Sequence, residues 1–435
     1  GLTMARKMKD SGIEWIGEIP EGWEVIPAKF LFKNSDIRRI ADDEQLTSSQ
    51  QFGIISQKDY TELTGSKVVL ANKGLADWKH VEPFDFIISL RSFQGGLEMS
   101  EITGCITWHY IVLKPCHKIC SYYYKWLFKS DSYIRALQRT CSFIRDGQDL
   151  RYSNFIQVPL FEPPLAEQEK IADYLNAECF RIDAMLTKTR SSIEEYKKLK
   201  QAVITQAVTK GVRGEREMKD SGIEWIGEIP VDWTIQRFAR VAEVKSNLVS
   251  PDNYLEYPQI SPENIEKDSG KLLLPCKTVG EVGIISGNHL FYKGQILYSK
   301  IRPKLNKVCI APFDGLCSAD MYPIETNNDT RYIMYCILSN GFLQQVSMIT
   351  ENRVKMPKIN QVELSKILVA MPCFLAEQKE IANYLDAKCA EIDKLIVKKE
   401  QLVKELESYK KSLIYEVVTG KREIFTDITR KFPNI

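Results

Sequence analysis

One stretch of the sequence occurs twice. Its first copy is Ala166-Glu-Gln-Glu-Lys-Ile-Ala-Asp-Tyr-Leu-Asn-Ala-Glu-Cys-Phe-Arg-Ile-Asp183, and its second is Ala376-Glu-Gln-Lys-Glu-Ile-Ala-Asn-Tyr-Leu-Asp-Ala-Lys-Cys-Ala-Glu-Ile-Asp393. Eleven of the eighteen positions are identical, and the two copies are 210 residues apart. The segment Met8–Pro20 returns unchanged as Met218–Pro230 at the same offset. The repeats predict a tandem duplication with two similar halves.

Each copy begins a charge-rich run that has the periodicity of one long helix. Apolar positions alternate steps of three or four with steps of seven, which is typical of a coiled-coil seam. We expect the two helices to pair through Ile171, Leu175, Ile182 and Leu186 in the first copy and Ile381, Leu385, Ile392 and Ile396 in the second. About 44 residues at 1.5 Å each predict a helix of roughly 65 Å.

A helix of this length with one apolar stripe requires a partner, and the nearest partner is its own copy. Antiparallel pairing would carry the two variable regions to opposite ends of a rod, whereas parallel pairing would place both at one end. We favour antiparallel pairing because it also returns the tail after Gly420 towards the first repeated segment.

The regions between the repeats mix short β-type runs with helical segments and frequent Gly and Pro, which predicts a small α+β domain in each half. Expected strands lie at 67–70, 84–89, 106–113, 295–298 and 307–311. Expected helices run from Tyr122 to about Leu137 and from Arg331 to Leu338. The predicted fold is therefore α+β, with two similar globular domains separated by two long helices that pair as an antiparallel coiled coil, in a pseudo-two-fold tandem repeat.

The predicted boundaries follow from these repeats. They are a first domain at 1–164 that includes the N-terminal repeated segment, a long helix at 165–211, a linker at 212–217, a second domain at 218–374, a second long helix at 375–420 and a tail at 421–435.

Composition is that of a globular protein, with 44% hydrophobic and 27% charged residues in 435. The sequence contains neither a run of about 18 apolar residues nor a signal-peptide pattern, so we expect a cytoplasmic location. The net charge of +2 neither requires nor excludes a nucleic-acid partner. The densest Cys/His group is Cys105, His109, Cys116, His117 and Cys120, which lacks paired CxxC motifs and favours free thiols over a zinc site.

Catalytic motifs are missing from the sequence. It contains no GxxxxGK[ST] loop, glycine-rich cofactor loop, HExxH or EF-hand loop, and no nucleophile elbow. It also lacks the Asp/Asn-Pro-Pro-Tyr/Phe tetrapeptide with which amino-methyltransferases hold a flipped base. These absences favour a binding protein over an enzyme.

Basic and amide side chains gather in a few segments of the variable regions, where phosphate and base contacts to DNA would be made. In the second half the candidates are Lys300, Arg302, Lys304, Lys307, Lys355, Lys358, Asn360 and Gln361. In the first half they are Arg91, Ser92, Gln94, Arg145, Gln148 and Arg151. The two sets occupy similar places with different residues, as expected for readers of two different DNA sequences.

The tandem plan resembles the specificity subunit of type I restriction-modification systems over essentially the whole chain. The resemblance rests on Ser11–Pro20 with Trp23, on the helix starts Pro-Pro-Leu-Ala-Glu-Gln168 and Leu-Ala-Glu-Gln378, and on the helix ends Ala-Val-Thr209 and Val-Val-Thr-Gly420. The segments 144–148, 301–303 and 356–361 also look like the target-recognition domains of that family. One departure is Pro372-Cys-Phe-Leu375, which replaces the usual paired prolines before the second helix.

The resemblance implies a non-catalytic DNA-recognition subunit. Each variable domain would read one half of a bipartite, asymmetric double-stranded site, and the helices would set the spacing and recruit two adenine methyltransferase subunits. Motor-nuclease restriction subunits would join for cleavage, and S-adenosylmethionine and ATP with Mg²⁺ would belong to these partners. Two alternatives remain: a specificity subunit of another methyltransferase-nuclease arrangement, and a coiled-coil scaffold whose domains bind proteins.

Overall fold

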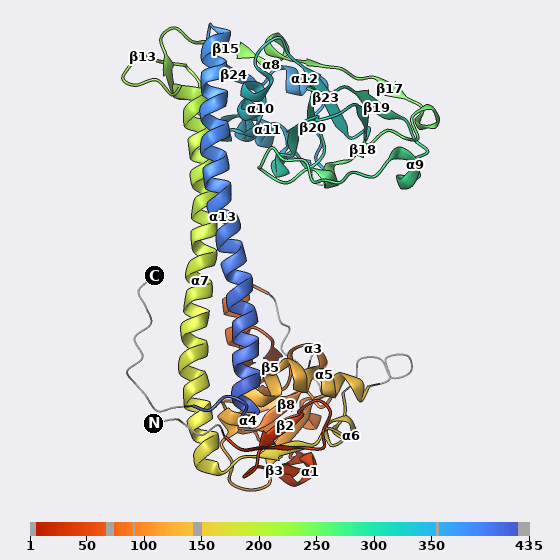
Figure 1. The fold of residues 1–435 in the computed structure, drawn as a ribbon, viewed down its shortest axis with the longest axis vertical. Coiled ribbons are helices and arrows are strands. Elements are labelled where there is room, and N and C mark those ends of the chain that lie inside the picture. Colours follow the sequence, from red (N-terminus) through yellow and green to blue (C-terminus); the bar gives the residue numbers. More distant parts are fainter. Residues whose placement is uncertain (1–5, 67–73, 90–91, 142–149, 354–355, 425–435) are drawn as a thin grey trace. The chain divides into compact units, whose positions relative to one another are not determined.

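The chain forms two compact units in a computed structural model that describes residues 6–66, 74–89, 92–141, 150–353 and 356–424 (Figure 1). Unit 1 comprises Gly1–Lys188 and Leu402–Ile435, and unit 2 comprises Thr189–Gln401. The long helices α7 (Leu165–Lys210) and α13 (Leu375–Val418) each contribute one part to either unit. The units therefore cut across the boundaries predicted from the sequence, which set the helices apart from the globular domains.

The repeated segment Met8–Pro20 forms the same hairpin in both halves. In unit 1, β1 (Met8–Asp10) pairs antiparallel with β2 (Glu18–Pro20), and in unit 2, β13 (Met218–Asp220) pairs with β14 (Glu228–Pro230) in the same register. The Asp carboxylate that ends the first strand accepts a hydrogen bond from the glycine N–H two residues later, at 2.9 Å in both copies. This Asx turn is the structural role of the repeated Asp-Ser-Gly sequence.

Each unit contains a four-stranded antiparallel sheet with equivalent strand order. In unit 1 the order is β4 (Phe32–Ser35), β11 (Ile111–Pro115), β8 (Phe86–Ile88) and β9 (Glu98–Met99). In unit 2 it is β16 (Glu243–Val244), β23 (Met321–Glu325), β20 (Ile296–Ser299) and β21 (Val308–Ile310). Matching strands are separated by nearly the same offset as the repeated segments, so the duplication includes the core of the variable regions as well.

Smaller sheets complete the two units. In unit 1, β3 (Glu24–Ile26) pairs with β12 (Leu160–Glu162), β5 (Leu46–Ser49) with β6 (Gly53–Ser56), and β7 (Lys79–Val81) with β10 (Gly104–Ile106). In unit 2, β15 (Thr234–Arg237) pairs with β24 (Leu368–Met371). A second sheet of unit 2 has the order β17 (Leu248–Val249), β19 (Asn288–Phe291), β22 (Gly315–Cys317) and β18 (Gln259–Ile260), where the last pair is parallel.

Helices cover these sheets in both units. Unit 1 contains α1 (Ala28–Leu31), α2 (Gln57–Thr64), α3 (Ser92–Gly95), α4 (Ser121–Lys129), α5 (Asp131–Arg139) and α6 (Tyr152–Phe155), with the 3₁₀ turn η1 (Leu75–Asp77). Unit 2 contains α8 (Phe238–Val241), α9 (Val279–Val282), α10 (Thr330–Leu338), α11 (Asn340–Thr350) and α12 (Gln361–Ser365), with η2 (Pro251–Asn253), η3 (Pro262–Asn264) and η4 (Pro303–Leu305). Among the described residues, no helix is long and apolar enough to cross a membrane.

The prediction of one helix over 122–137 is wrong, because two helices meet at Ser130. The Ser130 hydroxyl donates to Leu127 O at 2.7 Å, and Ser130 is the N-cap residue of α5. The matching Ser339 donates to Cys336 O at 2.7 Å between α10 and α11. A serine that bonds the preceding turn ends one helix and begins the next.

The single strand predicted at 106–113 is also wrong. A turn closed by Tyr110 N–H donating to Thr107 O separates β10 from β11. The strands predicted at 84–89, 295–298 and 307–311 correspond to β8, β20 and β21, and the helix at 331–338 corresponds to α10. The strand predicted at 67–70 lies outside the described residues.

Figure 1 shows α7 and α13 side by side, and the contacts within each unit make them antiparallel. In unit 2, Lys200 pairs with Asp393, and Arg213, just beyond the end of α7, pairs with Glu380. Partner positions on α13 thus fall as positions along the first helix rise. In unit 1, Lys410 pairs with Asp183, which repeats the Lys200–Asp393 contact with equivalent residues. The predicted α+β class with two antiparallel long helices is confirmed.

The end of each long helix completes the hydrophobic core of the unit in which the other helix begins. In unit 1, Leu413, Ile414, Val417 and Val418 of α13 belong to one buried cluster with Trp23, Tyr123 and the start of α7. In unit 2, Ile204, Ala207 and Val208 of α7 belong to a cluster with Trp233, Tyr332 and the start of α13. The Tyr123 hydroxyl donates to Val418 O at 2.8 Å, whereas the Tyr332 hydroxyl donates to Ala370 O at 2.8 Å and lies 3.4 Å from Val208 O. Gly420 therefore returns to the first repeated segment, as the antiparallel arrangement requires.

We expect Asp393→Asn to destabilise unit 2 more than Asp183→Asn destabilises unit 1. Lys200 and Lys271 both pair with Asp393, and the Lys200 side chain is only 8% exposed, whereas Asp183 is 55% exposed. Loss of the buried pair should cost about 1–3 kcal/mol of unfolding free energy, and loss of the exposed pair less than about 1 kcal/mol. Denaturant unfolding of the two variants measures the difference, and equal losses would contradict this ranking.

The same contact predicts an acid dependence. Burial alone would raise the pKa of Asp393, but hydrogen bonds from Lys271 and Lys200 outweigh burial and lower this pKa below its usual value. A lowered carboxyl pKa stabilises the fold above the unfolded-state pKa of about 4, and that contribution disappears as the pH falls below it. The Asp393→Asn variant should therefore lose less stability than the unchanged chain between about pH 5 and pH 3. Denaturant unfolding at both ends of this range measures the two losses, and identical losses would contradict the role of Asp393.

Candidate nucleic-acid interface

Two segments that are distant in the sequence lie together in unit 2. Residues 300–307 connect β20 to β21, and residues 356–361 lead into α12, which begins at Gln361. Ile359 N–H donates to Lys300 O at 2.9 Å, and Arg302 N–H donates to Pro357 O at 2.8 Å. Ile301 and Lys358 form an antiparallel β-bridge between these two hydrogen bonds. The pairing joins the two basic segments predicted from the sequence into one surface, which we call the 300/358 surface.

Local interactions fix the backbone of residues 300–307. Pro303 begins the short η4 turn, and the residues on either side of this turn, Arg302 and Asn306, have left-handed φ values of 45° and 44°. Asparagine tolerates this region, whereas arginine adopts it rarely. The Asn306 side chain is buried and donates to Leu338 O, which anchors the loop to α10. The loop is therefore built with a strained arginine at its exposed corner.

Two basic side chains of the 300/358 surface are available for a ligand. Arg302 and Lys304 are exposed, and neither lies within 4.0 Å of a carboxylate oxygen among the described residues. The other two are already in contact with neighbours. Lys358 Nζ lies 3.1 Å from Asp320 Oδ1, and Lys300 Nζ lies 5.3 Å from the centroid of the Tyr322 ring. Phosphates would thus meet Arg302 and Lys304 first and then compete for the other two.

Three further predicted residues of the second half have structural contacts. Lys307 is half-buried, and its ammonium donates to Pro262 O at 2.7 Å. Asn360 is the N-cap of α12, where its side-chain oxygen accepts from Glu363 N–H at 2.9 Å and its own N–H donates to the Glu363 carboxylate. The exposed Gln361 donates to the Ser246 hydroxyl. These contacts compete with any base contact by Asn360 or Gln361.

In the first half, the predicted residues do not form a comparable surface among the described residues. Ser92 is buried, and its hydroxyl accepts from Ser89 N–H at 2.8 Å, so the expectation that it contacts DNA does not fit this structure. Gln94 is exposed, and Arg151 is the exposed N-cap of α6. Arg91, Arg145, Gln148 and, in the second half, Lys355 lie outside the described residues.

Sequence reasoning missed three residues around the 300/358 surface. Asp320 binds Lys358, Tyr322 lies under Lys300, and His289 is buried nearby with no partner for Nδ1 among the described residues. Burial lowers the pKa of His289, and the charge of Lys300 lowers it further. The pairing of Ser299 with Met321 places Asp320 and Tyr322 beside Lys300. Only the register of β20 and β23 indicates these neighbours, and the sequence does not reveal it.

Most residues predicted to pair the helices are buried. They are Ile171, Leu175, Ile182 and Leu186 in unit 1 and Ile381, Leu385 and Ile392 in unit 2, whereas Ile396 is half-buried. Those in unit 1 belong to the cluster that contains the globular core, and so do Ile381 and Leu385 in unit 2. The first turns of each helix therefore pack on the globular part as well as on the partner helix.

The repeated Ala-Glu-Gln sequence joins each helix start to the rest of its unit. Glu167 pairs with Arg6 and accepts from the Trp23 indole N–H, and Glu377 pairs with Arg216. Gln168 accepts from Cys120 N–H at 2.9 Å, and Gln378 accepts from Asp329 N–H at 3.0 Å. Cys120 is the N-cap of α4, and Asp329 is the N-cap of α10. Each glutamine thus binds the backbone of a residue at which a neighbouring helix begins. These contacts explain why both halves carry the same three residues.

The Cys/His group considered for zinc is dispersed. Cys105 is buried in β10, His109 stacks on Trp108, and His117 pairs with Glu162 at 2.6 Å. No group of three or more His, Cys, Asp or Glu residues with metal-binding geometry occurs in the described part of the chain.

Comparison with known proteins relates the chain to one family. Residues 230–405, which include the 300/358 surface, match the family model of the type I restriction modification DNA specificity domain. The type I restriction enzyme EcoDI specificity subunit of Escherichia coli is 35% identical over 259 residues, which are 56% of this chain and 58% of that protein. The MjaVIII specificity subunit of Methanocaldococcus jannaschii is 25% identical over 61% of this chain and 62% of its own length. The chain thus spans less than two thirds of each of these two relatives.

Solved structures share the fold along nearly the whole chain. A chain described under "Structural basis underlying complex assembly and conformational transition of the type I R-M system" matches with a TM-score of 0.66 at 13% identity, covering 93% of this chain and 99% of that one. The HsdS subunit from Thermoanaerobacter tengcongensis matches with a TM-score of 0.53 at 14% identity, covering 93% and 98%. The resemblance to type I specificity subunits that the sequence motifs indicated is confirmed.

The capping role of Asn360 leads to a prediction about stability. Asn360→Ala should destabilise unit 2 by about 1 kcal/mol because Glu363 N–H loses its acceptor, whereas Asn360→Asp retains an oxygen and should be close to neutral. Thermal unfolding of both variants measures the difference. Equal stability of Asn360→Ala and the unchanged chain would contradict the capping role.

Proposed function

We propose that this chain, in which residues 230–405 form a type I restriction modification DNA specificity domain, is the DNA-recognition subunit of a type I restriction-modification complex. Each half binds one part of a bipartite, asymmetric double-stranded site, and the paired helices set the distance between the two parts. The chain itself is non-catalytic and acts in the cytoplasm. Adenine methyltransferase subunits, two per chain, and restriction subunits bind to it and carry the sites for S-adenosylmethionine and for ATP with Mg²⁺.

The observation that carries the proposal is the 300/358 surface. It lies within the matched domain and presents Arg302 and Lys304 without carboxylate partners among the described residues. Its backbone is held by hydrogen bonds between two segments and by the buried Asn306. A rigid loop with exposed cations is suited to hold phosphates in register while neighbouring side chains contact base edges.

The positive charge of this surface and the donor geometry of Arg302 suit DNA. Lys300 and Lys358 extend the positive charge beyond Arg302 and Lys304, and the planar guanidinium of Arg302 has the donor geometry that matches a phosphate or the O6 and N7 atoms of guanine. Burial and Lys300 lower the pKa of His289, which favours its neutral form and leaves the positive charge of this region to the lysines and Arg302.

Arg302→Ala should weaken DNA binding by the assembled complex, whereas Lys388→Ala should not. Lys388 is an exposed cation on α13 that is already paired with Glu391, which makes it a matched control. Loss of a phosphate contact should lower the slope of log affinity against log salt by about 0.9, and loss of a guanine contact should cost about 1–3 kcal/mol on the cognate duplex only. Titration of cognate and scrambled duplexes at several salt concentrations separates the two cases. Unchanged affinity and slope would refute the role of the 300/358 surface.

Exchange of residues 24–162 for the equivalent segment of another specificity subunit should change one half of the methylated site and leave the other half intact. The structure supplies the cut points, because Glu24 in β3 is paired with Glu162 in β12, so an exchanged segment enters and leaves at one place. Mapping of adenine methylation in cells that express the chain with its methyltransferase provides the measurement. An unchanged site would exclude sequence reading by the first half.

A further inference from the structure

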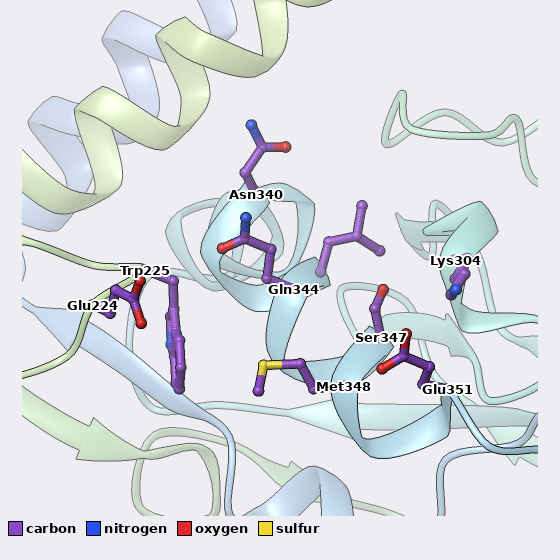
Figure 2. A pocket seen from close by; sticks show the side chains of 9 residues that line it. Glu224, Trp225, Lys304, Asn340, Gln344, Ser347, Met348 and Glu351 are labelled. Atoms are coloured by element: carbon purple, nitrogen blue, oxygen red, sulfur yellow. The ribbon is translucent and has the colours of Figure 1, made fainter.

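A groove in unit 2 shares Lys304 with the 300/358 surface, and its other lining residues are not used by the proposed function. Its volume is about 750 Å³, and its walls come from the segment that holds Glu224 and Trp225, from α11 and from Lys304 in η4 (Figure 2). Figure 2 shows Met348 and Glu351 on the α11 side and Trp225 and Glu224 on the other. Met348 is 61% exposed although it is a large apolar side chain. The groove combines an indole, a thioether and two carboxylates.

In the first half an arginine lies at the corresponding place. Glu14 and Trp15 correspond to Glu224 and Trp225 in the unchanged repeat, and α5 corresponds to α11 through the shared serine caps Ser130 and Ser339. The residue of α5 that matches Met348 is Arg139. Its guanidinium lies 3.4 Å from the Glu14 carboxylate in a surface pair, in which the Arg139 side chain is 67% exposed and the Glu14 side chain 87% exposed.

The second half keeps the carboxylate, in Glu224, and lacks the arginine, which Met348 replaces. Met348 carries no charge, and Glu224 has no cation within 4.0 Å among the described residues. Glu351 at the end of α11 has none there either, although Lys304 borders the same groove. The two carboxylates, which have no cation partner among the described residues, outnumber Lys304 in this groove, so they disfavour the phosphates of DNA and favour a cation.

We propose that this groove binds an arginine side chain of a partner protein, flanked by apolar residues, and that it does so only in the second half. The guanidinium takes the place that Arg139 holds in the first half, pairs with Glu224 and stacks on Trp225. Its aliphatic stem and the flanking residues contact Met348 and Leu343, which line the groove. Tryptophan and methionine are enriched in protein interfaces, and methionine adapts its shape to the side chain that it meets.

This inference differs from the DNA role of the neighbouring surface in the charge of its ligand. Arg302 and Lys304 attract an anion, whereas Glu224 and Glu351 attract a cation a short distance away. A protein that docks in the groove would therefore lie next to bound DNA, and Lys304 is the residue that borders both. In the first half, Arg139 pairs with the equivalent carboxylate of Glu14 and would compete with an arginine of a partner.

The test uses the full chain and a defined probe. Acetyl-Leu-Arg-Leu-amide is titrated while the indole N–H signal of Trp225 is followed by NMR, with Trp225→Phe to assign the signal. We expect a saturable shift that is lost when citrulline replaces arginine in the peptide, since citrulline keeps the shape and lacks the charge. Free arginine amide should bind at least about fivefold more weakly than the peptide, because it lacks the apolar neighbours.

Substitutions in the chain test where the peptide binds. Glu224→Gln should weaken peptide binding at least about fivefold, and Met348→Arg should also weaken it, because the new arginine competes for Glu224 as Arg139 pairs with Glu14. Both residues are exposed, so the fold should persist, and Glu14→Gln in the first half is the matched control that should leave binding unchanged. The proposal is overturned if citrulline peptide or free arginine amide binds equally well, if Glu224→Gln has no effect, or if duplex DNA or dilution of the chain moves the signal instead.

Discussion

The packing of each long-helix end against a tryptophan is the interaction on which the rest of the structure depends. Gly420 has a φ of 70°, and a Cβ at this position would lie 2.5 Å from Pro20 Cγ and 3.0 Å from the Trp23 ring. Gly211 has a φ of 76°, and a Cβ there would lie 3.4 Å from the Trp233 ring, which is an ordinary contact. The positive φ therefore favours glycine at both helix ends, and at Gly420 the close approach of the chain requires it as well. The core around Trp23 is therefore complete only when the segment 402–420 is present, although that segment comes from the opposite end of the sequence.

This closure also explains the pattern of identity between the halves. Glu167 and Gln168 at the start of α7 make the same kinds of contact as their counterparts Glu377 and Gln378 at the start of α13. An altered residue at one of these places would lose its contact with the arginine, or with the backbone N–H of the residue that caps α4 or α10. The loops between them face no such requirement, and there the two halves have diverged.

The sequence indicates the long helices because their apolar periodicity is local and sustained over about twelve turns. It fails where a polar side chain decides between two backbone paths. Ser130 divides the segment 122–137 into two helices by bonding Leu127 O, and a turn at 107–110 divides a run of β-forming residues. In both places composition predicts one element, and a single hydrogen bond produces two.

The sequence indicates basic residues of the candidate interface. It does not indicate the backbone pairing that brings them together. Lys300 and Lys358 are recognisable as basic residues from the sequence alone. Their proximity depends on the bridge between Ile301 and Lys358, which pairs two segments that are distant in the sequence. The same non-local geometry gives Asn360 its capping role, which is the ordinary preference of asparagine before a helix and competes with base recognition. Chemical type alone therefore overestimates the number of residues that are free to contact a ligand.

Equivalent positions in a duplicated fold share a place in the backbone and need not share exposure. Ser92 and Arg302 are equivalent by the offset of the repeats, yet Ser92 is buried with its hydroxyl bonded to Ser89 N–H, and Arg302 is an exposed corner in left-handed conformation. Arg139 and Met348 differ in a similar way. Arg139 pairs with Glu14, whereas Met348 leaves the equivalent Glu224 without a cation partner among the described residues. A surface in one half therefore cannot be transferred to the other by alignment. Each half has to build its own ligand surface on a common frame, so the two halves can bind different partners while the helices between them stay the same.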